Sequence, residues 1–115
     1  MSGDCLFCEI VAGKIRADVI GEGAEWIAFR DINPQAPSHV LVVPRRHIAT
    51  LDDLADGDEP LAGTLVTAAS RIAREEGLVE EGYRLVANCG AGAGQSVFHV
   101  HLHLLGGRGF SWPPG

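Results

Sequence analysis

The first half of the chain carries short apolar runs of the length of β-strands. Residues 19–21 and 25–30 form two such runs, and the glycine-containing segment 22–24 between them suits a turn. Residues 39–43 are apolar and largely β-branched after the first position, which is typical of a strand buried on both faces. Prolines within 33–37 place a loop there, because proline lacks the backbone donor that a helix or strand needs. The pattern therefore predicts three strands joined by turns and one loop.

Helical periodicity appears in residues 58–76, where leucine, alanine and isoleucine recur at intervals of three and four. Pro60 suits the first turn of a helix, and Gly77 suits its C-terminal end. A shorter segment, 6–13, also ends in a glycine and predicts a short N-terminal helix. One long and one short helix are therefore expected.

Two further strand-like runs, 83–88 and 99–105, follow the long helix, and the glycine-rich loop 89–94 lies between them. Short connections favour antiparallel pairing, and a helix that joins the third strand to the fourth has to cover one face of the sheet. We therefore expect an α+β fold in one domain over 1–115. It should contain a five-stranded antiparallel sheet, one long helix and a short N-terminal helix.

Composition narrows the class of protein. The chain has 9 basic and 15 acidic residues and a net charge of −6, which argues against a nucleic-acid partner because such proteins present a basic face. No basic and apolar leader opens the sequence, and the longest apolar stretch, 40–43, is far shorter than a membrane span. Three cysteines, an odd number, fit reduced thiols better than a disulfide framework. We expect a cytoplasmic protein with no membrane partner.

Three of the five histidines, His99, His101 and His103, alternate along the last predicted strand. Because strand side chains point to alternate faces, the imidazoles should share one face at intervals of about 7 Å, and the residues between them should pack on the long helix. Three interpretations stay open: a solvent-facing strand, a metal site of three histidines, or phosphoryl chemistry. Imidazole suits the last, because it is nucleophilic when neutral and its N–H groups donate to phosphate oxygens.

The histidine pattern resembles the signature of the histidine-triad (HIT) superfamily, in which histidines alternate with hydrophobic residues. The likeness extends along the chain, and the sequence most resembles the Hint branch, the histidine-triad nucleotide-binding proteins. Besides the triad, it rests on Phe29-Arg30-Asp31-Ile32-Asn33-Pro34-Gln35-Ala36-Pro37-Ser38-His39, Gly94-Gln95-Ser96-Val97-Phe98, Gly106-Gly107-Arg108 and Trp112-Pro113-Pro114-Gly115. The resemblance implies a HIT-like domain and a nucleotide-binding hydrolase.

The resemblance also implies a role for each of four side chains. His101 would be the nucleophile that attacks the α-phosphorus of a nucleoside monophosphate derivative, forming a nucleotidyl-histidine that water then hydrolyses. His103 would contact phosphate oxygens in the transition state, and His39 matches a further histidine near the phosphate. Ser96 would bind phosphate or help to protonate the leaving-group nitrogen. The implied substrates are adenosine or other purine nucleoside 5′-phosphoramidates and aminoacyl adenylates, with release of AMP.

A nucleotide pocket is implied by the same resemblance. Its residues are Asp31 and Ile32 at the ribose, Asn88, Gly94, Gln95 and Ser96 at the phosphate or ribose, and Phe7, Ile10 and Phe29 at the base. The glycine-rich loop is neither a P-loop nor a dinucleotide fingerprint, since it lacks Gly-Lys-Ser/Thr and no helix follows it. Its amides can still form an anion-binding nest, or the loop is a flexible hairpin. Taken alone, the acid and the serine also fit turn residues, and the apolar positions fit the core.

Cys5 and Cys8 form a C-x-x-C pair, which supplies half of the four ligands of a structural zinc site. Some HIT proteins complete a similar pair with a Pro-x-x-His histidine and the first histidine of the triad, and His47 and His99 match these positions. The resemblance therefore implies a structural zinc ion and no organic cofactor. A redox pair and two packed, reduced thiols are the alternatives. Cys89 has no partner in this scheme and is expected to be a small buried residue.

The C-terminal segment 112–115 predicts a partner. A tryptophan beside two prolines at a chain end suits contact with another surface, and in the Hint branch this segment reaches the neighbouring subunit. A homodimer is therefore expected. Two other functions stay open. One is dinucleoside polyphosphate hydrolysis, and the other is that of a nucleotide-binding interaction or sensor protein with low turnover.

Overall fold

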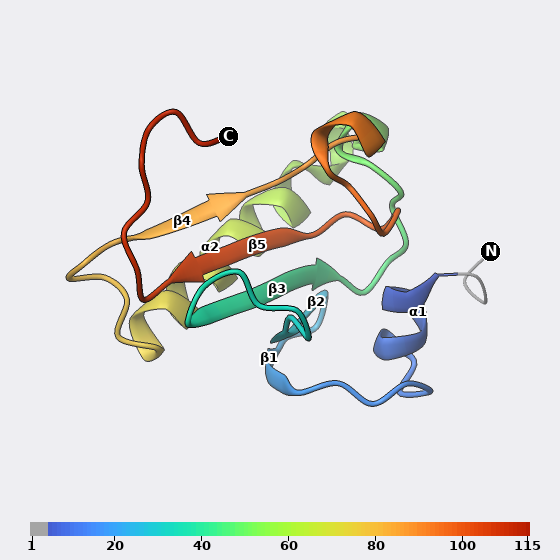
Figure 1. The fold of residues 1–115 in the computed structure, drawn as a ribbon. Helices are drawn as coiled ribbons and strands as arrows, with labels where there is room; N and C mark the ends of the chain where they lie inside the picture. The colour runs from blue at the N-terminus through green and yellow to red at the C-terminus, as the bar shows by residue number, and fades with distance from the viewer. Residues whose placement is uncertain (1–4) are drawn as a thin grey trace.

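Five strands form one antiparallel sheet in the computed structural model, which describes residues 5–115 (Figure 1). The first four residues of the predicted domain lie outside the described residues. In chain order the elements are α1 (Leu6–Val11), β1 (Val19–Glu22), β2 (Trp26–Arg30), β3 (Ser38–Pro44), the 3-10 turns η2 (Leu51–Asp53) and η3 (Asp56–Asp58), α2 (Glu59–Glu75), β4 (Tyr83–Val86), the 3-10 turn η4 (Ala91–Ala93) and β5 (Leu102–Gly106). The sheet order is β1-β2-β3-β5-β4. The predicted α+β fold is thereby confirmed.

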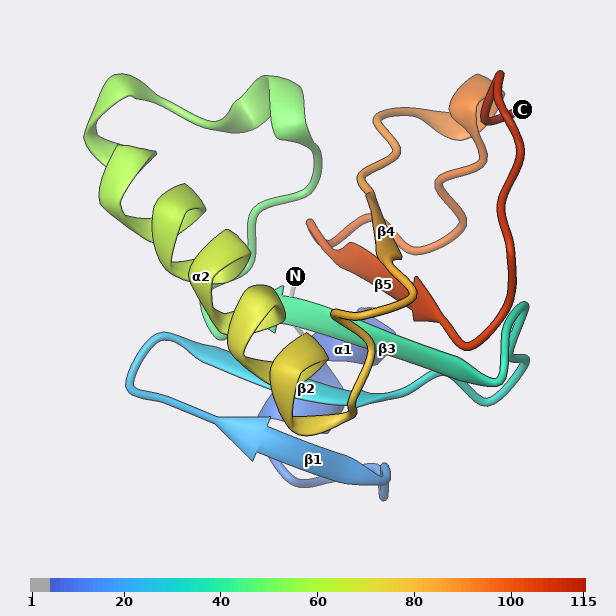
Figure 2. The same ribbon diagram turned by 90° about the vertical axis from the view of Figure 1, so that its left-hand side faces the viewer.

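Both faces of the sheet are covered, because its central strands carry apolar side chains on both sides. Every residue of β3 is buried, as the continuous apolar run predicts. Val40, Val42 and Ala28 pack in the core beside α2, whereas Leu41 and Val43 pack in a second core with residues of α1. Figure 2 shows α2 in front of the sheet and α1 behind it. The two helices thus hold β3 from opposite sides.

Helix α2 follows the periodicity of its sequence, and its buried residues are Leu61, Leu65, Ala68, Ala69, Ile72 and Ala73. Its C-terminal end is a Schellman motif. The N–H of Leu78 donates to the carbonyl of Ala73 at 2.9 Å, and that of Gly77 donates to the carbonyl of Arg74 at 3.1 Å. Gly77 has φ +73°, a left-handed conformation that glycine adopts without strain, so this residue sets where the helix stops.

The last strand is shorter than predicted. It begins at Leu102, so His99 and His101 precede it. The backbone N–H of Val100 donates to the carbonyl of Ile48 at 2.7 Å, and the carbonyl of His99 accepts from the His101 ring at 2.7 Å, so neither group joins a strand ladder. The predicted start of the strand at residue 99 is therefore wrong, and the rings of His101 and His103 lie 4.9 Å apart between centroids, closer than an even strand spacing. The predicted alternation still holds, because the rings of His99 and His101 both meet Phe7 of α1, whereas Val100 packs in the α2 core.

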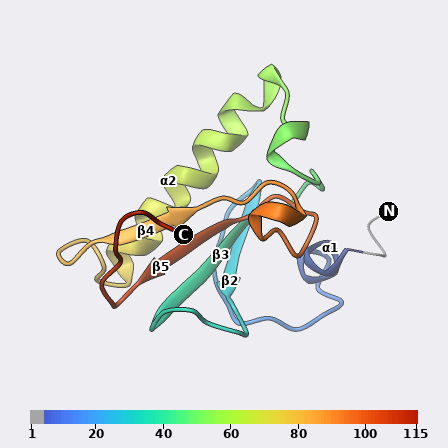
Figure 3. The same cartoon turned by 45° about the horizontal axis from the view of Figure 1, so that its top comes forward.

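After β5 the chain runs back beside β4 (Figures 1 and 3). The guanidinium of Arg84 donates to the carbonyl of Ser111 at 2.8 Å and, with Arg108, lies over the ring of Phe110. Trp112 stays 84% exposed beyond these contacts. Within residues 5–115, none of the helices combines the length and the apolar character needed to cross a membrane.

Candidate functional site

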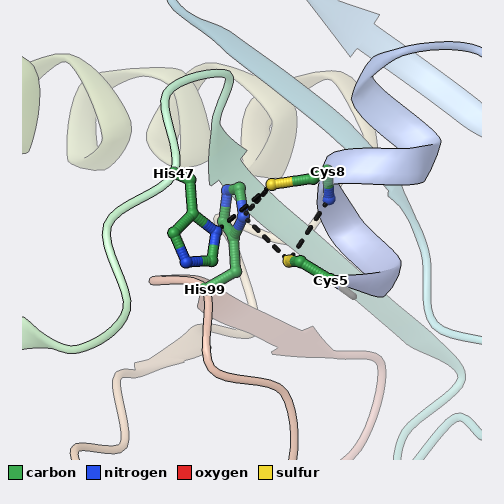
Figure 4. Close-up of side chains that lie close together, drawn as sticks. All are labelled: Cys5, Cys8, His47 and His99. Carbon is green, nitrogen blue, oxygen red and sulfur yellow. Dashed lines mark hydrogen bonds between the residues drawn. The ribbon is translucent and has the colours of Figure 1, made fainter. Parts of the chain in front are cut away.

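Four side chains from three separate segments meet beside the start of α1 (Figure 4). Cys5 caps α1, and its sulfur accepts from the backbone N–H of Cys8 at 3.4 Å. His47 comes from the segment after β3, and His99 from the segment before β5. One potential ligand atom from each residue lies within 4.8 Å of the other three. The four predicted metal ligands are therefore brought together.

The hydrogen bonds of this cluster leave a lone pair of His99 facing the thiols. His99 Nε2 lies 2.8 Å from the carbonyl oxygen of Pro44, and because a carbonyl only accepts, Nε2 carries the proton and Nδ1 does not. That Nδ1 lies 3.4 Å from Sγ of Cys5 and 3.5 Å from Sγ of Cys8. Nδ1 of His47 lies 3.2 Å from Sγ of Cys8. A carbonyl behind a histidine ligand is the usual way to orient it for a metal.

Protonation in the cluster follows from its burial. Burial lowers the pKa of His99 against the opposing effect of its hydrogen bond to Pro44, so the ring is neutral at pH 7. Burial, reinforced by the adjacent Cys5 thiol, raises the pKa of Cys8 to about 11, so a bound cation would have to displace this proton, as zinc does. Two cysteines and two neutral imidazoles are the donor set of tetrahedral zinc, so these residues fit the ion. Cys89, expected to be buried, is exposed, because it lies in the loop after β4.

A cavity of about 210 Å³ opens on the α1 side of the sheet. Its wall consists of Leu6, Phe7, Ile10, Ile15, Arg16, Ala17, Phe29, Arg30, Asp31, Ile32, Leu41, Ser96, Val97, His101 and His103. The three residues predicted at the base, both residues predicted at the ribose, and the predicted nucleophile are all among them. The cavity is thus apolar along α1. Apart from Arg16 in the loop after α1, its polar side chains belong to the end of β2 and to segment 96–103.

His101 carries its proton on the nitrogen that faces away from this cavity. Its Nδ1 lies 2.7 Å from the carbonyl oxygen of His99, so Nδ1 is the donor and the neutral ring has its lone pair on Nε2. Every fully buried side-chain nitrogen within residues 5–115 has a hydrogen-bond partner, whereas Nε2 of His101 has none, so Nε2 lies at the accessible part of the ring. Phe7 meets the same ring edge-on at 5.1 Å between centroids and fixes its other side. A positioned, unprotonated nitrogen on a cavity wall is what a nucleophile requires.

His103 is protonated on the opposite nitrogen. The backbone N–H of Gln35 donates to Nδ1 of His39 at 3.0 Å, so His39 carries its proton on Nε2. This Nε2–H faces Nδ1 of His103 at 2.9 Å, which leaves the proton of neutral His103 on its own Nε2. Burial, with smaller effects of the neighbouring histidines, lowers the pKa of His103 to about 4 and keeps it neutral at pH 7. His103 therefore offers a donor to the cavity, 4.9 Å between ring centroids from His101.

Three further predicted residues lie around these histidines. Asp31 accepts from the backbone N–H of Asn33 at 2.8 Å, and its second oxygen lies 3.4 Å from Nε2 of His39. Ile32 is 98% exposed on the cavity wall, so nothing within residues 5–115 covers its apolar side chain. The Ser96 side chain is exposed on the same wall. All three have atoms available to a ligand.

The glycine-rich loop does not contribute to the cavity wall. Gln95 is buried, and its side chain accepts from the N–H of Gly90 at 2.8 Å and donates to the carbonyl of Ala49 at 2.8 Å. Asn88 and Gly94 lie near each other but not on the wall. In this structure Gln95 braces the loop against the segment after β3.

Sequence reasoning missed the wall formed by the loop between α1 and β1. Ile15, Arg16 and Ala17 line the cavity although they show no periodicity and match no motif. One feature of the sequence could have indicated these residues: they follow directly after a predicted helix whose Phe7 and Ile10 were expected to contact the nucleotide base.

Comparison with known proteins agrees with this geometry. A family model described as the HIT domain matches residues 12–110. An uncharacterised HIT-like protein of Synechococcus elongatus is 47% identical over 115 residues and covers 100% of both chains. A purine nucleoside phosphoramidase of Escherichia coli is 42% identical over 108 residues, which are 94% of this chain and 91% of the relative.

Solved structures share the fold over nearly the whole chain. A HIT family hydrolase from Legionella pneumophila has a TM-score of 0.95 and 53% identity, covering 96% of this chain and 99% of its own. A histidine triad protein from Clostridium difficile has a TM-score of 0.91 and 38% identity, covering 94% of each chain. The chain therefore belongs to the HIT domain family, whose members include hydrolases.

Proposed function

We propose that this protein hydrolyses purine nucleoside 5′-phosphoramidates, and by the same chemistry aminoacyl adenylates, to the nucleoside monophosphate. The observation that carries the proposal is the opposite protonation of two neighbouring rings on one cavity wall. His101 presents a lone pair, and His103 presents an N–H. A nucleophile beside a donor for the phosphate oxygens is the arrangement that phosphoryl transfer needs. The relative from Escherichia coli named purine nucleoside phosphoramidase supports the substrate class.

The first step is attack of Nε2 of His101 on the α-phosphorus. The N–P bond to His101 forms as the bond from phosphorus to the leaving nitrogen breaks, and that nitrogen departs with the electron pair and takes up a proton from the solvent. Nδ1–H of His101 keeps its hydrogen bond to the carbonyl of His99, which stabilises the positive charge on the substituted ring. Water then attacks phosphorus and releases a proton to the solvent, the N–P bond breaks, and His101 regains its lone pair.

The remaining polar groups bind the substrate around this step. Nε2–H of His103 donates to a phosphate oxygen, and His39 holds His103 in the required tautomer. Ser96, exposed on the wall, donates to phosphate or to the leaving nitrogen. The carboxylate of Asp31 accepts from the ribose hydroxyls, and Ile32 packs on the sugar.

The apolar end of the cavity receives the base, between Phe7, Ile10 and Phe29. The loop that carries Ser96 is shaped by residues that do not line the cavity themselves, namely Asn88, Gly94 and Gln95. A flat, weakly polar purine suits this end, since apolar walls favour the ring faces.

A structural zinc ion is proposed at Cys5, Cys8, His47 and His99, on the grounds of their convergence and donor chemistry. The ion would supply a cross-link between α1 and the segments at 47 and 99, and it takes no part in the reaction. By holding His99 it would also fix the carbonyl that orients His101.

We further propose a cytoplasmic homodimer. The 84% exposure of the Trp112 ring supports a partner surface at the C-terminal segment, and the reduced cysteines at 5 and 8 are consistent with a reducing compartment. Light scattering coupled to size-exclusion chromatography should give twice the chain mass, and a monomer at micromolar concentration would contradict the dimer.

The test of the function is release of AMP from adenosine 5′-phosphoramidate. We expect steady turnover by the wild type and a loss of about 10³-fold or more in His101→Ala. His101→Asn should lose as much, because its amide keeps the bulk of the ring but has no nucleophilic nitrogen. Val66→Ala, on the exposed face of α2, is the matched control. Wild-type rates in His101→Ala, or faster turnover of diadenosine polyphosphates, would contradict the proposal.

A further inference from the structure

The cavity has, among residues 5–115, one positively charged side chain without an ion-pair partner. Its wall carries two arginines, Arg16 and Arg30. Arg30 is held in an ion pair, because its guanidinium donates to both carboxylate oxygens of Glu76, at 2.8 and 3.0 Å. Arg16 makes no hydrogen bond or ion pair with any residue in 5–115 and is exposed at the cavity. Its donors are therefore available to a ligand.

The part of the cavity wall that carries Arg16 differs in composition from the part that carries the reacting groups. The loop residues beside it, Ile15 and Ala17, and the α1 residues Leu6 and Ile10 on the same wall are all apolar. A nucleotide whose phosphate is held at His101 has to direct its base toward this apolar part. Arg16 is then the only side chain there, within the described residues, with free hydrogen-bonding groups.

We infer that Arg16 determines base specificity and selects purines with an oxygen at position 6, guanine and hypoxanthine, over adenine. This inference rests on the proposed function for the placement of the nucleotide. A guanidinium has five N–H donors and no acceptor. The O6 and N7 of guanine both accept and match its planar fork, whereas adenine presents the N6 amino donor beside N7.

The absence of an acceptor beside Arg16 strengthens the selection at the edge of the base that carries position 6 and N7. Asp31, the only carboxylate on the cavity wall within residues 5–115, belongs to the polar end beside His39. Among residues 5–115, no acceptor side chain lines the apolar end, so the adenine amino group gains no side-chain partner from them there. A polar edge that loses water without gaining a partner weakens binding.

The experiment measures binding of GMP, IMP and AMP by calorimetry to the full chain and to three variants. The wild type should bind GMP and IMP about fivefold to tenfold more tightly than AMP. Arg16→Ala should bring this ratio close to one. Arg16→Lys should recover little of it, because an ammonium lacks the planar fork. Lys14→Ala removes a cation from the same loop that does not line the cavity, and it should keep the wild-type ratio.

Three results would overturn the inference. The first is a wild-type preference for AMP or for neither base, and the second is an unchanged ratio in Arg16→Ala. The third is an equal loss of affinity for all three nucleotides, which would mean that Arg16 only stacks on the base. AMP release from adenosine 5′-phosphoramidate, measured on the same preparations, separates this inference from the proposed function. If His101→Ala turns over like the wild type but Arg16→Ala still removes the preference for GMP and IMP, only the proposed reaction is contradicted. If His101→Ala is inactive but Arg16→Ala keeps the preference, only the base selection is contradicted.

Discussion

The segment 99–103 joins two clusters of side chains that both contain histidines and behave differently. At His99, four potential ligands turn toward one another and the imidazole is completely buried. At His101 and His103, the rings border a cavity, and each keeps one nitrogen without a hydrogen-bond partner among residues 5–115. The first cluster is closed, as structural metal sites are, and the second is open, as sites that bind a substrate are.

The difference between the histidines arises from the group that one of their two ring nitrogens contacts, because this contact decides which nitrogen carries the proton. The carbonyl of Pro44 places the proton of His99 on Nε2 and turns its lone pair toward the cysteines. The carbonyl of His99 places the proton of His101 on Nδ1 and leaves the lone pair on Nε2. In His103 the partner is another imidazole, and the result is a donor. A backbone carbonyl or a neighbouring ring thus decides whether a histidine presents a lone pair to the thiols, a lone pair to the cavity or an N–H to the cavity.

The largest effect on the closed cluster should come from removing a thiol. Cys8→Ser should lose bound zinc, measured by plasma emission on purified protein, and about 3 kcal/mol or more of unfolding free energy, because loss of a structural metal is among the costlier changes. Cys89→Ser is the matched control, since this exposed cysteine lies outside the cluster. Equal metal content and stability in the two variants would mean that the cluster is only packed thiols and imidazoles.

A smaller effect, confined to the open cluster, is expected for His39→Ala. The change removes the N–H that holds Nδ1 of His103, so the N–H that we propose as donor to phosphate is no longer fixed on Nε2. We expect kcat to fall about tenfold with KM and zinc content little changed. Nitrogen chemical shifts of His103 should show the two tautomers mixed. An unchanged kcat would show that the bond between the two rings has no role in the reaction.

The smallest effect concerns pH. Burial lowers the pKa of His103 to about 4, below its ordinary value, so in NMR titrations this ring should stay neutral until well below pH 6. Because the unfolded chain takes up this proton first, His103 contributes stability above pH 6.5 that is lost as the pH falls from about 6.5 toward 4. The pH dependence of unfolding in this range should be weaker in His103→Asn. A His103 titration midpoint near 6.5 would contradict this environment.

The sequence was most informative where apolar periodicity governs structure. The runs at 39–43 and 58–76 predicted β3 and α2, because burial on two faces or on one helical face leaves a regular pattern. The start of β5 was not predictable in this way. The backbone N–H of Val100 donates to the carbonyl of Ile48, and the carbonyl of Pro44 faces the ring of His99 and no backbone N–H of a strand partner. Such tertiary bonds leave no local signal in the sequence.

The residues of the candidate site could be predicted where they belong to a recognisable sequence motif. The cysteine pair and the spaced histidines converge in space as the resemblance implies. The contribution of Arg16 was not predictable, because the loop that carries it has no repeating pattern and its position depends on how α1 packs on the sheet. The bracing role of Gln95 likewise depends on its contact with Ala49, far away in the chain.

The most direct test of the division of roles within segment 99–103 is to trap the covalent intermediate. Wild-type protein mixed with adenosine 5′-phosphoramidate should be quenched with base within milliseconds, because phosphorus–nitrogen bonds to histidine are labile in acid, and its peptides analysed by mass spectrometry. An adenylyl group on His101, absent from His99 and His103 and lost in His101→Asn, is the predicted result. An adduct on either of the other two histidines, or turnover with no adduct at any time point, would contradict the account.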